Sequence, residues 1–323
     1  MPSEDRMAIV ARLEPVRCGL GLVVGIALFG CEVRQDVALP IVEQGLIAFD
    51  ARLGGWDARE EIFLIDRLGT GLRQLTHTPS PYFSGYPRWS PNKDRIAFIS
   101  NRHGDEEIYV MDADGGNLTM LTNNPGDDWG QTWMPDGSAI SFVSGPADSG
   151  RLYLIDLDGT NQRLVDEALG PVSGDVAWSA SGRRFLFTSG RDGLGEDIYL
   201  FDLDVRLVSR ITDSPGGSSS ANAVWAKGGD HVLFASNRAG LWDIYRMNPD
   251  GSDVRRLTET TVGINGSWSL AQSPDGSELV FTSDRFGDSE VFLENMELFV
   301  VNVDGSNLRR ITTNQWMDGH PDW

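Results

Sequence analysis

The chain has 323 residues, of which 37 are glycine, and it carries a formal net charge of −20 at pH 7. An acidic surface of this size repels phosphate backbones, so the charge argues against binding to nucleic acid. Clusters of Gly, Asp, Asn and Pro recur throughout, and no helical periodicity persists beyond the N-terminal segment, which is typical of many short strands joined by tight turns. We therefore expect an all-β protein.

The N-terminal segment is predicted to be a targeting signal rather than part of the fold. Residues 18–29 (CGLGLVVGIALF) are apolar or small and follow two arginines, which is the layout of a signal peptide. The run is too short to span a bilayer as a helix. It leads into residues 28–31 (LFGC), which resemble the lipobox of bacterial lipoproteins. This resemblance implies that residues 1–30 are removed as a lipoprotein signal peptide and that Cys31 carries the lipid.

A lipid on Cys31 would attach the chain to a membrane through several acyl chains, which is enough for stable anchoring. Residues 31–44 are then the lipidated cysteine and a polar linker. We expect a cell-envelope protein that faces the periplasm, and Glu32 favours the outer membrane by resemblance to known sorting rules. The other cysteine, Cys18, lies inside the predicted signal peptide. The sequence therefore predicts no disulfide, no metal and no cofactor.

From residue 45 to the end, one unit recurs six times, which is the signature of a repeat architecture. Each unit has a turn like Ser-Pro-Asp-Gly, a strand ending in phenylalanine, a polar loop, a strand with an aromatic residue, an Asp-Gly turn and a Leu-Thr pair. Asp-Gly supplies the positive φ that tight hairpins require. The period of roughly 45 residues is that of a four-stranded propeller blade. The strand phenylalanines are Phe49, Phe98, Phe142, Phe187, Phe234 and Phe281.

The two ends of the repeat region are predicted to share one blade. A tryptophan precedes the strand phenylalanine in most units, as Trp89 does in the second, whereas the first unit has no recognisable inner strand. The missing strand appears at the C-terminus as residues 320–323 (HPDW). We therefore predict that residues 45–323 form a six-bladed β-propeller of four-stranded antiparallel blades, closed by a C-terminal strand that completes the first blade. Such closure removes a sheet edge.

The repeated segments resemble a known family. Residues 86–100 (YPRWSPNKDRIAFIS), 236–258 (SNRAGLWDIYRMNPDGSDVRRLT) and 273–287 (SPDGSELVFTSDRFG) are similar to the TolB-like propeller repeat, and the similarity covers nearly everything after the linker. The resemblance implies the same architecture. It indicates little about function, because one fold can host many functions.

The loops after the phenylalanine strands and the loops that lead into the tryptophan strands lie on the same face of such a ring. They vary between units, so we expect the binding surface there. Residues that break the repeat are the best candidates for contact with a ligand. These candidates are His103, Asp128, Trp129, Trp242, Trp316 and His320.

An arginine recurs shortly after the strand phenylalanine in most units. Recurrence favours a structural role, in which the guanidinium binds carboxylates or carbonyls of a neighbouring blade. The predicted inter-blade arginines are Arg102, Arg191, Arg238 and Arg285.

The sequence offers little support for catalysis. The four histidines have no metal-binding spacing, and no glycine-rich phosphate loop precedes a helix. We therefore expect a monomeric, non-catalytic envelope lipoprotein that binds a protein, peptide or glycan. One alternative is a glycan lyase or hydrolase that uses His320, Arg285 and Asp128 at the axial mouth of the propeller. Another is a sensor or assembly scaffold within a Tol-like or secretion complex.

Overall fold

The computed structural model describes residues 45–54, 59–146, 149–172, 174–192, 195–260, 267–284 and 296–323. The predicted signal peptide, Cys31, the linker and Arg285 lie outside these residues. Within them, no helix is long and apolar enough to cross a membrane.

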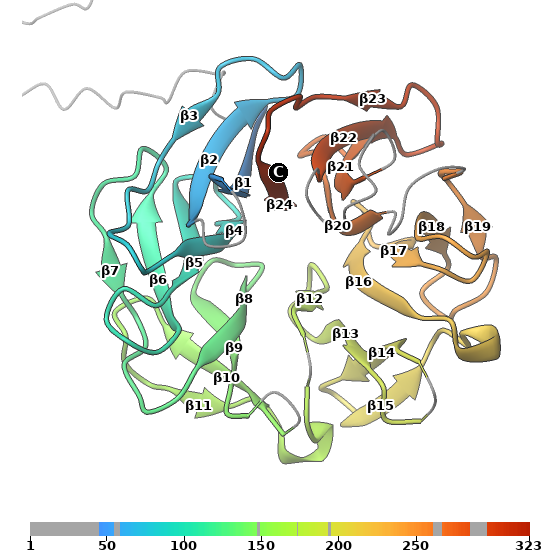
Figure 1. Ribbon diagram of the computed structural model, residues 1–323. Helices are drawn as coiled ribbons and strands as arrows, with labels where there is room; N and C mark the ends of the chain where they lie inside the picture. The colour runs from blue at the N-terminus through green and yellow to red at the C-terminus, as the bar shows by residue number, and fades with distance from the viewer. Residues whose placement is uncertain are drawn as a thin grey trace, which may run out of the picture. The chain divides into compact units, whose positions relative to one another are not determined.

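Six four-stranded antiparallel sheets surround an axis, as the blades of a propeller do, which confirms the predicted fold class (Figure 1). Blade 1 contains β24 (Met317–Asp322), β1 (Leu46–Arg52), β2 (Glu60–Asp66) and β3 (Arg73–Gln74); blade 2 contains β4 (Ser84–Trp89), β5 (Arg95–Ser100), β6 (Glu107–Asp112) and β7 (Thr119–Met120); blade 3 contains β8 (Asp128–Trp133), β9 (Ala139–Ser144), β10 (Arg151–Asp156) and β11 (Arg163–Leu164).

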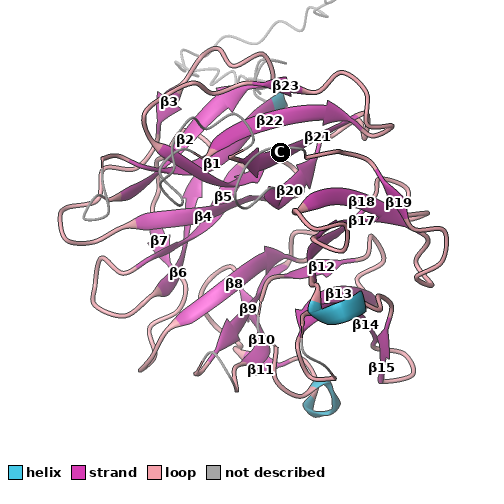
Figure 2. Cartoon of the chain, turned by 45° about the vertical axis from the view of Figure 1, so that its right-hand side comes forward, coloured by secondary structure: helices cyan, strands magenta, loops and turns pink. Residues whose placement is uncertain are grey.

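The second half of the ring repeats this order, and in each blade the first strand named lies nearest the axis (Figure 1). Blade 4 contains β12 (Val176–Trp178), β13 (Arg184–Ser189), β14 (Asp197–Asp202) and β15 (Leu207–Arg210); blade 5 contains β16 (Ser220–Trp225), β17 (Val232–Ser236), β18 (Asp243–Met247) and β19 (Arg255–Arg256); blade 6 contains β20 (Ser267–Gln272), β21 (Glu278–Ser283), β22 (Glu297–Asn302) and β23 (Arg309–Arg310). The short 3₁₀ helices η2 (Glu167–Leu169) and η3 (Pro215–Gly217) lie in the connections before β12 and β16, and strands and loops make up nearly all the rest (Figure 2).

The predicted closure of the ring is confirmed. The C-terminal strand β24 pairs antiparallel with β1, with Asp318 opposite Ala51. The indole Nε1 of Trp323 donates to the carbonyl of Gly45 at 3.0 Å, and the ring is 4 % exposed. Since β24 also contacts β4 of blade 2 and β20 of blade 6, it joins the two ends of the propeller.

The hydrophobic core lies between the blades, and for this reason apolar residues occupy both faces of each strand. On β5, Ile96 and Phe98 pack in a cluster with residues of blade 1, whereas Ala97 and Ile99 pack with residues of blade 3. Within a blade, the recurring aromatics stack across the strands, as Phe98 and Tyr109 do with ring centroids 5.7 Å apart. A sheet packed on one face only would leave half of these side chains in water.

The recurring Leu-Thr pair has a hydrogen-bonding role. The threonine hydroxyl bonds to a buried carboxylate near the start of the third strand and accepts from the next backbone N–H; Thr258 bonds to Asp243 Oδ1 at 2.8 Å and accepts from the N–H of Ile244 at 3.0 Å. In blade 3 both partners change, since Arg151 replaces the acid and Asp166 the threonine. A buried carboxylate without its donor is costly, so the two positions vary together. The other pairs with this bond are Glu61–Thr76, Glu107–Thr122 and Asp197–Thr212.

Candidate functional site

The inner strands share an irregularity that brings one residue of each to the axis. In blades 1, 2, 3, 5 and 6, the inner strand carries a β-bulge, so that two of its residues face one residue of the next strand. In blades 1, 2, 3 and 5, the first bulged residue has a left-handed backbone conformation. Its φ is 57° at Tyr86, 65° at Gly130, 52° at Asn222 and 41° at His320. Side chains other than glycine rarely adopt this conformation, so these positions are candidates for function rather than for stability.

Two cavities lie at the axis, and bulged residues line both: Asn222 lines the first, and Tyr86 and Gly130 line the second. The first is an axial cavity of about 480 Å³ that touches all six inner strands and includes Arg88, Thr132, Asn222, Ser269 and Asp322. The second, here called the mouth cavity, has a volume of about 560 Å³ and opens on the face of the variable loops at blades 1 to 4.

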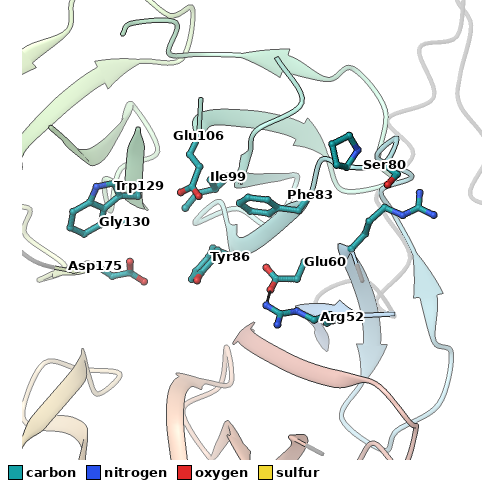
Figure 3. A pocket seen from close by; sticks show the side chains of 12 residues that line it. Arg52, Glu60, Ser80, Phe83, Tyr86, Ile99, Glu106, Trp129, Gly130 and Asp175 are labelled. Atoms are coloured by element: carbon teal, nitrogen blue, oxygen red, sulfur yellow. Dashed lines mark hydrogen bonds and ion pairs between the residues drawn. The ribbon is translucent and has the colours of Figure 1, made fainter. Parts of the chain in front are cut away.

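The mouth cavity has an aromatic wall and an acidic lining (Figure 3). Phe83 precedes β4, Tyr86 is the bulged residue of β4, and Trp129 is the second residue of β8, so three aromatic rings of two neighbouring blades face one space. The carboxylates come from three blades. They are Glu60 of blade 1, Glu106 of blade 2 and Asp175, which directly precedes β12 of blade 4.

Two of these carboxylates are neutralised by arginines. Arg52 forms an ion pair with Glu60, and Arg88 forms one with Asp175. Arg59, which also lines the cavity, donates to the carbonyl of Thr78 at 3.2 Å. Each of these three guanidinium groups therefore already has an ion-pair or hydrogen-bond partner.

Glu106 differs from the other acids of the cavity. Its backbone N–H donates to Asp127 Oδ1 at 3.0 Å, and its carbonyl accepts from the N–H of Asp128 at 2.7 Å, so its backbone is held on both sides. Within the described part of the chain, its carboxylate has no hydrogen-bond or ion-pair partner. Burial raises the pKa of Glu106, and the nearby charges of Asp127 and Glu60 raise it further.

A polar cluster behind Tyr86 connects the cavity to the closing strand. The rings of Tyr86 and His320 are stacked with centroids 3.8 Å apart. His320 Nδ1 lies 2.9 Å from Asp50 Oδ2, and the same oxygen accepts from the N–H of Tyr86 at 2.6 Å. Burial alone would lower the pKa of His320, but the charge and hydrogen bond of Asp50 raise it above its ordinary value. Burial acts to raise the pKa of Asp50, and the attraction of His320 holds it below its ordinary range.

The structure brings two of the predicted binding residues to this site and places the others elsewhere. Trp129 lines the mouth cavity and His320 stacks on its Tyr86 wall. His103 is exposed, and its Nδ1 bonds to the hydroxyl of Tyr109 at 2.6 Å, outside the cavity. Trp242 and Trp316 are half-buried and pack against core clusters; the ring of Trp316 lies 5.3 Å from that of Phe63.

Asp128 differs most from its prediction as a ligand contact. Its side chain is fully buried, and Oδ1 accepts from Asn124 Nδ2 at 3.2 Å. Burial, together with the carboxylate of Glu107, raises the pKa of Asp128 to about 6. It therefore faces the interior between blades 2 and 3 rather than the variable loops.

The three recurring arginines among the described residues make contacts within their own blades, and Arg191 also reaches a connection between blades, so the inter-blade role stays a prediction. Arg102 donates to Ser84 and Ser100 of blade 2 at 2.8 and 3.0 Å and lies over the rings of Phe98 and Tyr109. Arg238 makes the corresponding contacts in blade 5. Arg191 also reaches the carbonyls of Leu169 and Pro171 in the connection before blade 4. In blade 2, Arg102 is connected to the segment that follows blade 1 through Ser84, because the hydroxyl of Ser84 also forms a hydrogen bond with that of Thr78 at 2.7 Å.

Sequence reasoning missed most of the cavity because it searched the loops for residues that break the repeat. Arg52, Glu60 and Glu106 lie at strand ends, and Tyr86 and Asp175 lie on or beside inner strands. The sequence held only a weak signal. When the six units are aligned on the tryptophan, or on Gln272 in the sixth, the residue three positions before it differs in every unit, but the residues beside it vary as well. The residues at this position are His320, Tyr86, Gly130, Asp175, Asn222 and Ser269.

The described residues show no cluster of three or more His, Cys, Asp or Glu side chains that could hold a metal ion. The aromatic faces and carboxylates that line the mouth cavity can contact a group of a ligand.

Comparisons with known proteins agree with this architecture. The model of the family described as the tricorn protease N-terminal beta propeller domain matches residues 55–268. The chain is 33% identical over 104 residues to the Tol-Pal system protein TolB of Syntrophotalea carbinolica, which covers 30% of this chain and 24% of that protein. It is 27% identical over 201 residues to the TolB homolog of Chlorobium luteolum, which covers 61% of this chain and 33% of the homolog. The chain thus matches about a quarter to a third of the length of these relatives.

A solved structure extends the likeness over the whole ring. The crystal structure of TolB from Acinetobacter baumannii superposes with a TM-score of 0.73 at 21% identity, and the match covers 87% of this chain and 67% of TolB. At this identity the likeness shows a shared fold. Together, the matches confirm the resemblance to TolB-like propeller repeats.

Proposed function

Since the chain belongs to the family of the tricorn protease N-terminal β-propeller domain and is similar in sequence to TolB, we propose that it is a non-catalytic cell-envelope protein that binds a protein partner through the mouth cavity. The observation that carries this proposal is the aromatic wall of Phe83, Tyr86 and Trp129 at an open cavity on the variable face. Aromatic side chains beside open space are typical anchors for a partner, because they bury large area at low entropic cost.

The glycan lyase or hydrolase alternative gains less support from the described residues. His320 is engaged with Asp50, and Asp128 is fully buried. A fully buried Asp128 cannot exchange a proton with a substrate at the axial mouth. A role as sensor or assembly scaffold in an envelope complex is compatible with the proposed function, since it too requires a bound protein.

We expect Trp129→Ala to abolish recovery of the partner when the purified chain is used as bait on detergent-solubilised envelopes. Trp129 lines the mouth cavity and also a second hollow beside it, so its removal leaves the site without its largest contact surface. Trp242→Ala is the matched control, because Trp242 is a half-buried tryptophan that packs in the core near β18 and lies outside the cavity. Recovery is normalised to folded protein, measured by circular dichroism. Equal recovery by Trp129→Ala and the wild type would refute the proposed function.

We further propose that Cys31 is the lipidated N-terminus of the mature protein and holds the propeller at the periplasmic side of the outer membrane. The sequence LFGC at residues 28–31 after an apolar run supports this proposal. Cys31→Ser is expected to move the protein from the membrane to the soluble fraction, because the variant has no sulfur to carry the lipid. Intact mass of the wild type should show the loss of residues 1–30 and the addition of acyl chains. A mature N-terminus without acyl groups contradicts the proposal.

A further inference from the structure

The mouth cavity carries a negative charge that no described residue neutralises. Its other two acids are paired with arginines, and Arg59 is bonded to a backbone carbonyl. The carboxylate of Glu106 remains without a partner in the described residues, although burial and two neighbouring acids make its ionised form costly. A half-buried carboxylate of this kind gains most from a cation that enters the site.

The surroundings of Glu106 favour one class of cation. In Figure 3 the carboxylate of Glu106 lies between the rings of Trp129 and Phe83 in the view, and Tyr86 is drawn below them. Aromatic faces attract ammonium and guanidinium groups through the negative face of the ring. The site therefore combines an ionic contact with cation–π contacts, and the described residues show no group of three or more His, Cys, Asp or Glu side chains that could hold a metal ion there.

The shape of the site suits a long side chain. Glu106 and Trp129 also line a second hollow of about 680 Å³, which is bordered by Pro125, Asp127 and Pro146. Glu106 and Trp129 thus lie between two open cavities. The backbone of a bound partner has room in one cavity, on one side of Trp129, while a long side chain of that partner extends to the carboxylate of Glu106. The fixed backbone of Glu106 keeps its carboxylate in place before the ligand arrives, which reduces the entropic cost of binding.

We infer that the mouth cavity binds a lysine or arginine side chain of the protein partner, with Glu106 as its counter-ion and Trp129 as its aromatic support. The inference rests on the proposed function and names the group that is recognised. The net charge of −20 would attract a basic partner before contact, and this attraction weakens as salt is added.

The test uses fluorescein-labelled pentapeptides Gly-Ser-X-Ser-Gly, with blocked ends and with X as arginine, lysine or norleucine, whose binding is followed by fluorescence anisotropy. The wild type should bind the arginine or lysine peptide about tenfold more tightly than the norleucine peptide. Glu106→Gln should lose this preference and leave binding of the norleucine peptide unchanged. Glu259→Gln removes the same charge at an exposed position outside the cavity and should behave as the wild type.

Two outcomes overturn the inference: a wild type without preference for the basic peptides, and a Glu106→Gln variant that retains the preference. Circular dichroism and melting of Glu106→Gln should match the wild type, since the carboxylate has no partner in the described residues. The envelope pull-down separates this inference from the proposed function. If Trp129→Ala loses the partner while Glu106→Gln retains it, the cavity binds a protein but not through a basic side chain.

Discussion

Deletion of residues 317–323 is expected to produce aggregated protein, or to lower the midpoint of thermal unfolding by about 10 °C or more. The deletion removes β24, which leaves β1 as an exposed sheet edge and opens the core on both sides of blade 1. It also removes the buried Trp323 and the bond from the N–H of Trp89 to Asp322 Oδ2 at 2.6 Å. Loss of a buried tryptophan alone costs about 3–5 kcal/mol, a large share of a typical stability of roughly 5–15 kcal/mol.

Differential scanning calorimetry of the purified proteins measures this effect. Removal of residues 32–40, which precede the first described strand, provides the control and should leave the midpoint unchanged. If the two truncations melt at the same temperature, β24 does not contribute the stability that its contacts imply.

The propeller should unfold at a lower temperature at pH 8 than at pH 5.5. Asp318 on the closing strand is fully buried, and its burial, together with the carboxylate of Glu297, raises its pKa to about 7. The unfolded chain releases this proton near pH 4, so the stability from the protonated form is lost as the pH rises from about 4 to 7. His320 acts in the same direction, because its raised pKa contributes stability below about pH 6.5 that is lost at higher pH.

Asp318→Asn is expected to reduce this pH dependence and to raise the melting temperature at pH 8 by roughly 5–10 °C. The amide keeps the shape of the buried acid, can still bond to Asn314, and offers an N–H to Glu297, whose Oε2 has no hydrogen bond within the described residues. Glu259→Gln, which removes an exposed acid, should retain the full pH dependence. A pH profile of Asp318→Asn that coincides with that of the wild type would show that Asp318 titrates as an ordinary aspartate.

The location of the ligand contacts shows where sequence reasoning stops. Trp129 and Trp316 both break the repeat and both lead into or lie before an inner strand, so the sequence does not distinguish them. In the structure both are half-buried and pack against core clusters, but Trp129 also borders the mouth cavity, whereas Trp316 packs on the ring of Phe63 and does not line that cavity. Which tryptophan borders the cavity depends on the blade beside it, and that contact joins residues far apart in the chain.

The number of blades, their strand order and the closure of the ring can all be predicted from the sequence. The blades arise from local antiparallel hairpins that repeat the same turn and the same aromatic pair, such as Phe98 with Tyr109. Local contacts of this kind are encoded within one unit and can be counted along the chain. The closure joins distant residues, but the sequence shows it because the inner strand absent from the first unit is found at the C-terminus.

The composition of the mouth cavity depends on how the blades are arranged in the ring. Glu60, Tyr86, Trp129 and Asp175 come from four blades, and the ring brings them together. The bulge that gives Tyr86 its left-handed backbone is a property of pairing with the next strand, and no turn motif announces it. The carboxylate of Glu106 has no partner among the described residues because the arginines nearby bind other groups. These arginines and their partners come from several blades, so the sequence of one repeat unit does not show which acid is left unpaired.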